Sequence, residues 1–112
     1  GVFDALAAGA KTGAELSADL RADADALERL LDGCVALGLL EHAPGGYANT
    51  PAAAAYLTTS SPLRMLGYAN YSDAVLWKLW AHLDDAVREG THRWKQTYGW
   101  DGPIFQNFFR DE

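Results

Sequence analysis

The longest regular pattern in the chain runs from Ser61 to Gly90, where apolar residues recur at helical spacing. These residues are Leu66, Ala69, Leu76, Leu79, Leu83 and Val87. Ser61 predicts the N-cap of one long helix, Pro62 suits its first position, and Gly90 predicts its C-terminal end. A helix of roughly 29 residues would be about 43 Å long, more than the width of a domain of this size. We therefore expect part of it to pack against a partner chain, a bound ligand or both.

The pattern before this stretch predicts three short helices. A first helix should end near Gly9, because the apolar residues at the start of the chain have helical spacing: Val2, Phe3, Leu6, Ala7 and Ala10. Thr12 and Glu15 have the form of a capping box, which predicts the start of a second helix. Asp23 predicts the N-cap of a third helix that ends at Gly38. Its predicted inward stripe consists of Leu27, Leu30, Leu31, Cys34 and Leu37.

The period then changes from helical to alternating. Residues 39–42 and 47–49 flank the turn sequence Ala43-Pro44-Gly45-Gly46, which predicts a small β-hairpin. Three short helices followed by a two-stranded hairpin is the order of a winged helix. We therefore predict a mainly α chain with a winged-helix-like subdomain over 1–60, including an alanine-rich helix from Thr50 to about Leu57. The long helix belongs to a second part, 61–112.

After Gly90 the pattern is less regular. Residues 91–102 mix Trp94, Tyr98 and Trp100 with polar residues, which predicts a loop or a broken helix. Pro103 predicts the start of a last helix, with aromatic residues on or near one face. The apolar residues of this last segment are Ile104, Phe105, Phe108 and Phe109.

Composition limits the classes of function. The 112 residues are 49% apolar and 21% charged, which fits one globular domain. The single Cys34 excludes an intramolecular disulfide and fits a reducing compartment. No apolar run is long enough to span a bilayer and no signal peptide is visible, so we expect a cytoplasmic protein without membrane contact. Because the chain opens without Met on an apolar stretch, we expect it to be a piece of a longer protein.

The charge pattern argues against nucleic-acid binding, which a winged helix would otherwise suggest. The net charge is −6, and residues 1–50 carry three basic and eight acidic side chains. Phosphate contacts need Lys or Arg, yet the segment from Arg21 to Leu37 has a net charge of −2. The hairpin tip has no basic residue. We therefore predict no nucleic-acid partner.

No residue predicts catalysis or metal binding by itself. His82 lies at helical spacing from Asp85, and His92 lies near Glu89, but nothing completes a set of three or four ligands. Exposed polar residues on an amphipathic helix explain both histidines. Cys34 lies on the predicted buried stripe, where a small apolar filler is the expected role.

An aromatic band is the candidate binding feature. Tyr68, Tyr71, Trp77 and Trp80 lie along the predicted long helix, and they cannot all share its leucine face. An aromatic stripe at helical spacing is more often core than ligand site. Asn70 and Asp73 lie among these rings, however, and a few polar groups among aromatics suit a pocket for a flat molecule with polar edges. Phe105, Phe108 and Phe109 could close the same pocket.

Several segments together resemble the N-terminal region of the hydroxyindole (acetylserotonin) O-methyltransferase family. They are Gly1-Val2-Phe3-Asp4-Ala5-Leu6, Leu27-Glu28-Arg29-Leu30-Leu31-Asp32, Gly38-Leu39-Leu40, Tyr47-Ala48-Asn49-Thr50, Tyr56-Leu57 and the run from His82 to Gly90. Each is weak alone, but their order and spacing cover nearly the whole chain.

The resemblance implies a homodimerisation domain placed before a domain that binds S-adenosylmethionine. It implies that residues 61–112 contain a long dimerisation helix, roof the pocket of a small aromatic acceptor and begin the linker to that second domain. By position, the acceptor-binding residues would be Tyr71, Trp77, Trp80, Phe105 and Phe109. The family's methyl-donor site and catalytic histidine would lie beyond residue 112, so the resemblance implies no catalytic or cofactor-binding residue here.

Two other interpretations remain open. One is a stand-alone dimeric winged-helix regulator or interaction module without catalysis. The other is a transcription factor that senses an aromatic ligand, which the acidic third helix disfavours.

Overall fold

The computed structural model describes residues 1–102, which divide into two compact units, Gly1–Gly67 and the residues from Tyr68 onward. The chain is mainly α-helical, as predicted, with one two-stranded antiparallel sheet among the described residues. Within the same residues, no helix is both long enough and apolar enough to cross a bilayer.

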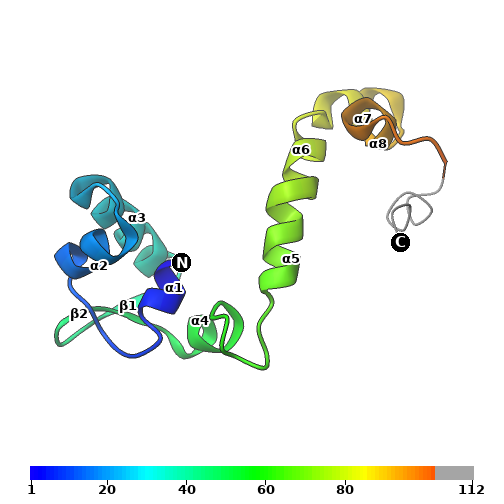
Figure 1. The fold of residues 1–112 in the computed structure, drawn as a ribbon. Helices are drawn as coiled ribbons and strands as arrows, with labels where there is room; N and C mark the ends of the chain where they lie inside the picture. The colour runs from blue at the N-terminus through cyan, green and yellow to red at the C-terminus, as the bar shows by residue number, and fades with distance from the viewer. Residues whose placement is uncertain (103–112) are drawn as a thin grey trace. The chain divides into compact units, whose positions relative to one another are not determined.

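The first unit has the predicted order of three helices, a hairpin and a fourth helix (Figure 1). Its elements are α1 (Val2–Ala5), α2 (Gly13–Leu20), α3 (Ala24–Ala36), β1 (Leu40–Ala43), β2 (Gly46–Asn49) and α4 (Pro51–Tyr56).

The caps predicted at the starts of α2 and α3 are confirmed. The Thr12 and Glu15 side chains form the reciprocal capping box, with the Glu15 carboxylate accepting from the Thr12 amide at 2.8 Å. Asp23 caps α3 by accepting from the Ala26 amide at 2.9 Å. Thr50 caps α4 in the same way. Each cap satisfies an amide that the helix itself leaves unpaired.

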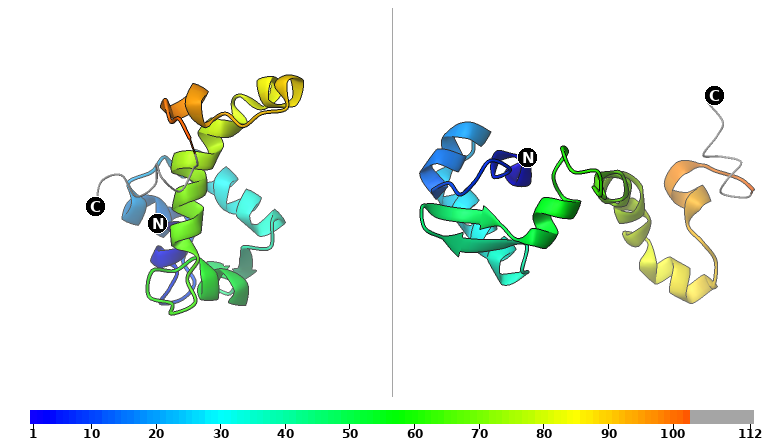
Figure 2. Two further views of the ribbon diagram at one scale, coloured as in Figure 1. Left: turned by 90° about the vertical axis from the view of Figure 1, so that its right-hand side faces the viewer. Right: turned by 90° about the horizontal axis from the view of Figure 1, so that it is seen from below.

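The hairpin is also confirmed, and it is tied to the segment before α2. In its register, Leu40 pairs with Asn49 and Ala43 with Gly46. The two strands appear as adjacent arrows in the right panel of Figure 2. Lys11 exchanges two backbone hydrogen bonds with Tyr47, at 2.8 and 3.0 Å. Gly46 has φ +124°, and a side chain there would collide with the Lys11 backbone, so this turn requires glycine.

Six apolar side chains form the core of the first unit. They are Leu6, Leu16, Leu27, Leu31, Leu40 and Tyr47. The Tyr47 hydroxyl donates to the Asp32 carboxylate at 2.7 Å, which raises the pKa of Tyr47 to about 12 together with burial. This bond joins the hairpin to α3 at the edge of the core.

The predicted inward stripe of α3 is too wide. Leu27 and Leu31 are buried and Cys34 packs against them, but Leu30 is 55% and Leu37 76% exposed. At about 100° per residue, Leu30 and Leu37 lie roughly 60° and 80° outside the arc that Leu27 and Leu31 define. A leucine at helical spacing can therefore still lie outside the buried face of its helix.

The long-helix region divides into several elements. They are α5 (Leu66–Tyr71), a π-helical segment η1 (Ser72–Leu76), α6 (Trp77–Trp80), α7 (Leu83–Glu89) and α8 (Trp94–Tyr98). The elements from α5 to α6 follow one another without a gap in sequence, and their coils share one axis in Figure 1.

The prediction of one helix from Ser61 to Gly90 is wrong at its start. The Ser61 hydroxyl does not cap a helix; it donates to the Ala55 carbonyl at 2.5 Å. The Met65 amide donates to the Tyr56 carbonyl at 2.8 Å. Both bonds fold the segment before Leu66 back onto α4, so helix begins only at Leu66.

The same prediction is wrong in its middle, because the helix is interrupted at Ala81 and His82. The His82 amide bonds the Leu79 carbonyl, three residues back, at 3.0 Å, which tightens the turn and ends α6. No glycine or proline marks this break in the sequence. The predicted stop is correct, since Gly90 ends α7 in the left-handed conformation with φ +65°.

Candidate ligand-binding pocket

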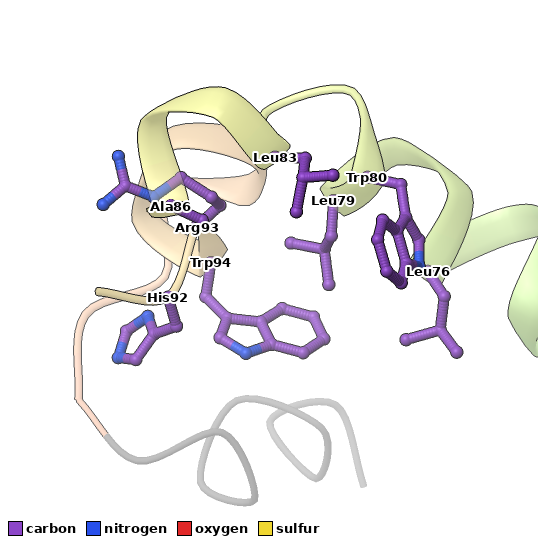
Figure 3. A pocket seen from close by; sticks show the side chains of 8 residues that line it. All are labelled: Leu76, Leu79, Trp80, Leu83, Ala86, His92, Arg93 and Trp94. Carbon is purple, nitrogen blue, oxygen red and sulfur yellow. The ribbon is translucent and has the colours of Figure 1, made fainter. Parts of the chain in front are cut away.

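An apolar pocket of about 240 Å³ lies within the second unit (Figure 3). Residues from η1, α6, α7, the following turn and the start of α8 form it. The lining residues are Leu76, Leu79, Trp80, Leu83, Ala86, His92, Arg93 and Trp94. Complete sites for drug-sized ligands usually have about 300–1,000 Å³, so this pocket is somewhat smaller than such a site.

The chemistry of the pocket is that of a flat apolar surface. Two indoles and several aliphatic side chains line it, and its imidazole comes from His92. In Figure 3 the Arg93 guanidinium points away from the leucines, so its aliphatic stem contributes to the wall. The pocket therefore suits the faces of an aromatic ring.

Arg93 holds the turn between α7 and α8. The side chain is only 9% exposed, and its guanidinium donates to Glu89 at 2.8 Å and to Gln96 at 3.1 Å. It also donates to the Thr91 hydroxyl. Gln96 in turn donates to Asp85 at 2.8 Å, which ties α8 to α7 a second time. This network fixes the two residues beside Arg93 that line the pocket, His92 and Trp94.

Three aromatic rings of the last described segment stack on one another. The Trp94 and Trp100 ring centres are 5.3 Å apart at an interplanar angle of 9°, and those of Tyr98 and Trp100 are 4.9 Å apart. The Tyr98 hydroxyl donates to the Val75 carbonyl in η1 at 2.9 Å. The stack therefore connects a wall of the pocket to the π-helical segment.

The sequence-predicted binding residues have different positions in the structure. Trp80 lines the pocket, and Trp77 lies beside it in a second hollow of about 230 Å³ that Trp77, Trp80 and Ala81 form. Trp77 is 74% and Trp80 64% exposed. Tyr71 is half-buried and lines neither hollow. Phe105, Phe108 and Phe109, with the predicted last helix, lie outside the described residues.

Sequence reasoning missed the contribution of residues 92–94. The pattern predicts a loop or broken helix in this segment, and α8 is indeed a short helix. Two signals could have found its role. Trp94 and Tyr98 lie four residues apart, and so do Glu89 and Arg93, which is the spacing of side chains that meet on one helix face.

The described residues do not fit a methyl-donor or metal site. The paired glycines of the hairpin turn, Gly45 and Gly46, pack near Ala10 and Lys11, so no ligand has room at the Gly46 backbone. Both strands of this part of the chain belong to that hairpin. Within residues 1–102, no three His, Cys, Asp or Glu side chains gather as metal ligands.

Comparison with known families identifies the class of protein. A family model described as the O-methyltransferase dimerisation domain matches residues 1–59. The chain belongs to this family.

The individual relatives are methyltransferases. Human acetylserotonin O-methyltransferase is 40% identical over 119 residues, an alignment that covers 100% of this chain and 34% of the relative. The 3-hydroxy-5-methyl-1-naphthoate 3-O-methyltransferase of Streptomyces sahachiroi is 39% identical over 88 residues, covering 79% of this chain and 26% of the relative. The chain thus spans about a third or less of the length of these relatives.

Solved structures of the same kind have a similar fold. The crystal structure of human N-acetylserotonin methyltransferase in complex with SAM matches with a TM-score of 0.84 and 38% identity, covering 99% of this chain and 34% of the other. The structure of PigF with SAH matches with a TM-score of 0.84 and 28% identity, covering 98% of this chain and 32% of the other.

Proposed function

We propose that this chain is the N-terminal part of an S-adenosylmethionine-dependent O-methyltransferase, where it forms a homodimer and roofs the pocket of a hydroxylated aromatic acceptor. Residues 1–60 form a winged-helix-like subdomain. Residues 61–112 supply the dimerisation and acceptor-lid region and the start of the linker to the methyl-donor domain. The protein works in the cytoplasm and binds no nucleic acid.

The observation that carries the proposal is the exposed aromatic surface of the second unit. Among its described residues only Arg93 is buried, while Trp77, Trp80 and Val87 are each more than 60% exposed. Exposed aromatic and aliphatic side chains in one region mark a surface that binds a partner or a ligand. A dimer partner and an acceptor are the two occupants that a methyltransferase of this family would provide.

The pocket supports an aromatic acceptor. Trp80 and Trp94 offer flat faces, and His92 places a polar group beside them. Two relatives are named for acceptors with fused aromatic rings, acetylserotonin and a hydroxynaphthoate. The acceptor-binding set in this proposal is Tyr71, Trp77, Trp80, Phe105 and Phe109.

The role of this chain is to position the acceptor and exclude water. Holding an acceptor hydroxyl in line with a methyl group lowers the barrier by removing rotational freedom, and a dry site strengthens every electrostatic interaction in it. Proton removal and methyl transfer belong to residues outside this chain. No residue of this chain is assigned a catalytic role.

The deciding experiment uses the natural gene product. We expect a chain roughly three times as long as this one that is a dimer by light scattering and binds S-adenosylmethionine in calorimetry. We expect it to methylate acetylserotonin or a hydroxynaphthoate. Trp80→Ala should raise the KM for the acceptor about tenfold and leave the affinity for S-adenosylmethionine unchanged. Tyr56→Ala, on α4, is the matched control.

Two results would overturn the proposal. A product that ends near residue 112 and binds no S-adenosylmethionine would leave the dimeric regulator or interaction module. Methyl transfer with an acceptor KM that Trp80→Ala does not change would remove this surface from the acceptor site.

A further inference from the structure

The direction of the pocket tryptophans depends on one irregular turn. In η1 the Trp77 amide donates to the Ser72 carbonyl, five residues back, instead of four. A π turn holds one more residue than an α turn, so side chains beyond it are rotated by about 100° relative to an uninterrupted α-helix. Trp77 and Trp80 follow directly after this turn. The turn therefore decides which way both indoles face.

A π turn needs support from outside its own helix. A backbone ladder that changes from four-residue to five-residue spacing and back leaves a carbonyl without its usual donor. The Tyr98 hydroxyl donates to the Val75 carbonyl at 2.9 Å and lies 3.4 Å from the Ala74 carbonyl. Both carbonyls belong to η1. Tyr98 thus supplies a donor at the place where the ladder is irregular.

Tyr98 is held in position for this contact. Its ring stacks on Trp100 and packs against Trp94 at 5.9 Å between ring centres. Burial raises the pKa of Tyr98, with a smaller contribution from the nearby Tyr71. The hydroxyl is therefore protonated at neutral pH and acts as a donor.

We infer that Tyr98 is a positioning residue, whose hydroxyl bond to Val75 stabilises the π turn and thereby directs Trp80 into the pocket. π-helical turns occur frequently at functional sites. The orientation of Trp80 determines which flat ligands the pocket accepts, because its indole is one of the two in the wall. The effect on ligands rests on the proposed function, whereas the link between Tyr98 and η1 does not.

The first test compares Tyr98→Phe with the unchanged full gene product by hydrogen exchange. Phenylalanine keeps the ring and its stacking and removes only the hydroxyl. We expect amides 76–80 to exchange about fivefold faster, as the loss of one neutral hydrogen bond predicts, and amides of α3 to be unchanged. Tyr56→Phe is the control, because Tyr56 is 46% exposed and no hydrogen bond of its hydroxyl is found among the described residues. Equal exchange at 76–80 in Tyr98→Phe and the unchanged protein would overturn the inference.

The second test asks whether the hydroxyl acts on ligand positioning. Near-ultraviolet circular dichroism should report a changed tryptophan environment in Tyr98→Phe and none in Tyr56→Phe. With acetylserotonin as the probe, Tyr98→Phe should raise the acceptor KM about fivefold and leave kcat and the KM for S-adenosylmethionine unchanged. A lower kcat together with higher KM values for both substrates would show a merely structural role and overturn the inference. If the gene product transfers no methyl group, the proposed function fails, while exchange and dichroism still decide the role of Tyr98.

Discussion

The two units of this chain are built in different ways. The first unit packs six buried apolar side chains, Leu16 and Leu31 among them, into one cluster and begins three of its helices with side-chain caps. In the described part of the second unit, the one buried side chain is that of Arg93. Its leucines and tryptophans lie half-buried or exposed around hollows. The first unit is thus specified by its own core, and the second by polar bonds and ring stacking that leave apolar surface exposed.

This difference gives each unit its own part of the proposed function. Burial of apolar surface is the main favourable term in folding, so the core of the first unit contributes to its stability whether or not a partner is bound. A unit with an exposed apolar face gains this favourable free energy only when a ligand or a partner covers that face. A region that both lines a ligand pocket and contacts a partner is expected to have this construction.

The largest expected effect is the loss of stability when a core side chain of the first unit is truncated. The same kind of change in the second unit should have a much smaller effect. Leu31→Ala should lower the free energy of unfolding by about 2–5 kcal/mol, because Leu31 is fully buried and the change leaves a cavity. Val87→Ala is the matched change in the second unit, where the side chain is 74% exposed, and should cost less than about 0.5 kcal/mol in the dissociated chain. Urea unfolding at low protein concentration measures both. Equal losses of unfolding free energy in the two variants would contradict the difference between the two units.

The same pair of variants sharpens the comparison when the protein concentration is raised. A partner that covers Val87 stabilises the folded chain by mass action, so the cost of Val87→Ala should then grow with concentration. The cost of Leu31→Ala should stay constant. A concentration-independent cost for Val87→Ala would place the dimer contact elsewhere.

A smaller effect is expected at the buried arginine. Arg93→Met keeps much of the stem but removes the hydrogen bonds to Glu89, Thr91 and Gln96. Hydrogen bonds to charged groups contribute about 1.5–3 kcal/mol, so the opening free energy of α8 should fall by about 2 kcal/mol. Hydrogen exchange of the α8 amides measures this opening locally.

Lys95→Met is the control for Arg93→Met. Lys95 pairs with Asp101 at 2.8 Å, but both side chains are more than 70% exposed. Solvent screens such a pair, so we expect no measurable change in exchange. If both variants opened α8 equally, the network around Arg93 would not be what holds α8 against α7.

The sequence predicted the first unit better than the second, for physical reasons. Caps such as Thr12 with Glu15 and the glycine turn at Gly46 are local, and local chemistry can be read from neighbouring residues. The break at His82 and the π turn after Tyr71 carry no such marker. Non-local bonds accompany these irregularities, such as the contact of Tyr98 with Val75, which lies 23 residues away in sequence.

The candidate site shows the same limit. Trp80 could be chosen from helical spacing, since aromatic residues repeat along one segment. For Arg93 and Trp94 the four-residue spacings to Glu89 and Tyr98 are only a partial signal, because their role also depends on the turn that brings α8 back to α7. Helical periodicity gives the face of one element and does not say which later element returns to cover it.

The smallest predicted effect concerns acid, and it belongs to the first unit. Hydrogen bonds from the Thr59 amide and then the Thr59 hydroxyl lower the pKa of Asp4 below its ordinary value of 3.8. Bonds from the Thr12 amide and hydroxyl likewise lower the pKa of Glu15 below its ordinary value of 4.5. A carboxylate with a lowered pKa in the folded state stabilises that state above the unfolded pKa. This stabilisation is lost as the pH falls through the folded pKa.

The free energy of unfolding of the first unit should therefore fall as the pH drops from about 5 to about 3. The double variant Asp4→Asn with Glu15→Gln should have a lower stability at neutral pH and a flatter pH dependence, because the groups that titrate are gone. Urea unfolding at a series of pH values measures the slope. An unchanged slope in the double variant would mean that other carboxylates govern the acid response, and the capping box and the Asp4–Thr59 contact would then contribute nothing specific to the stability of the unit that has its own core.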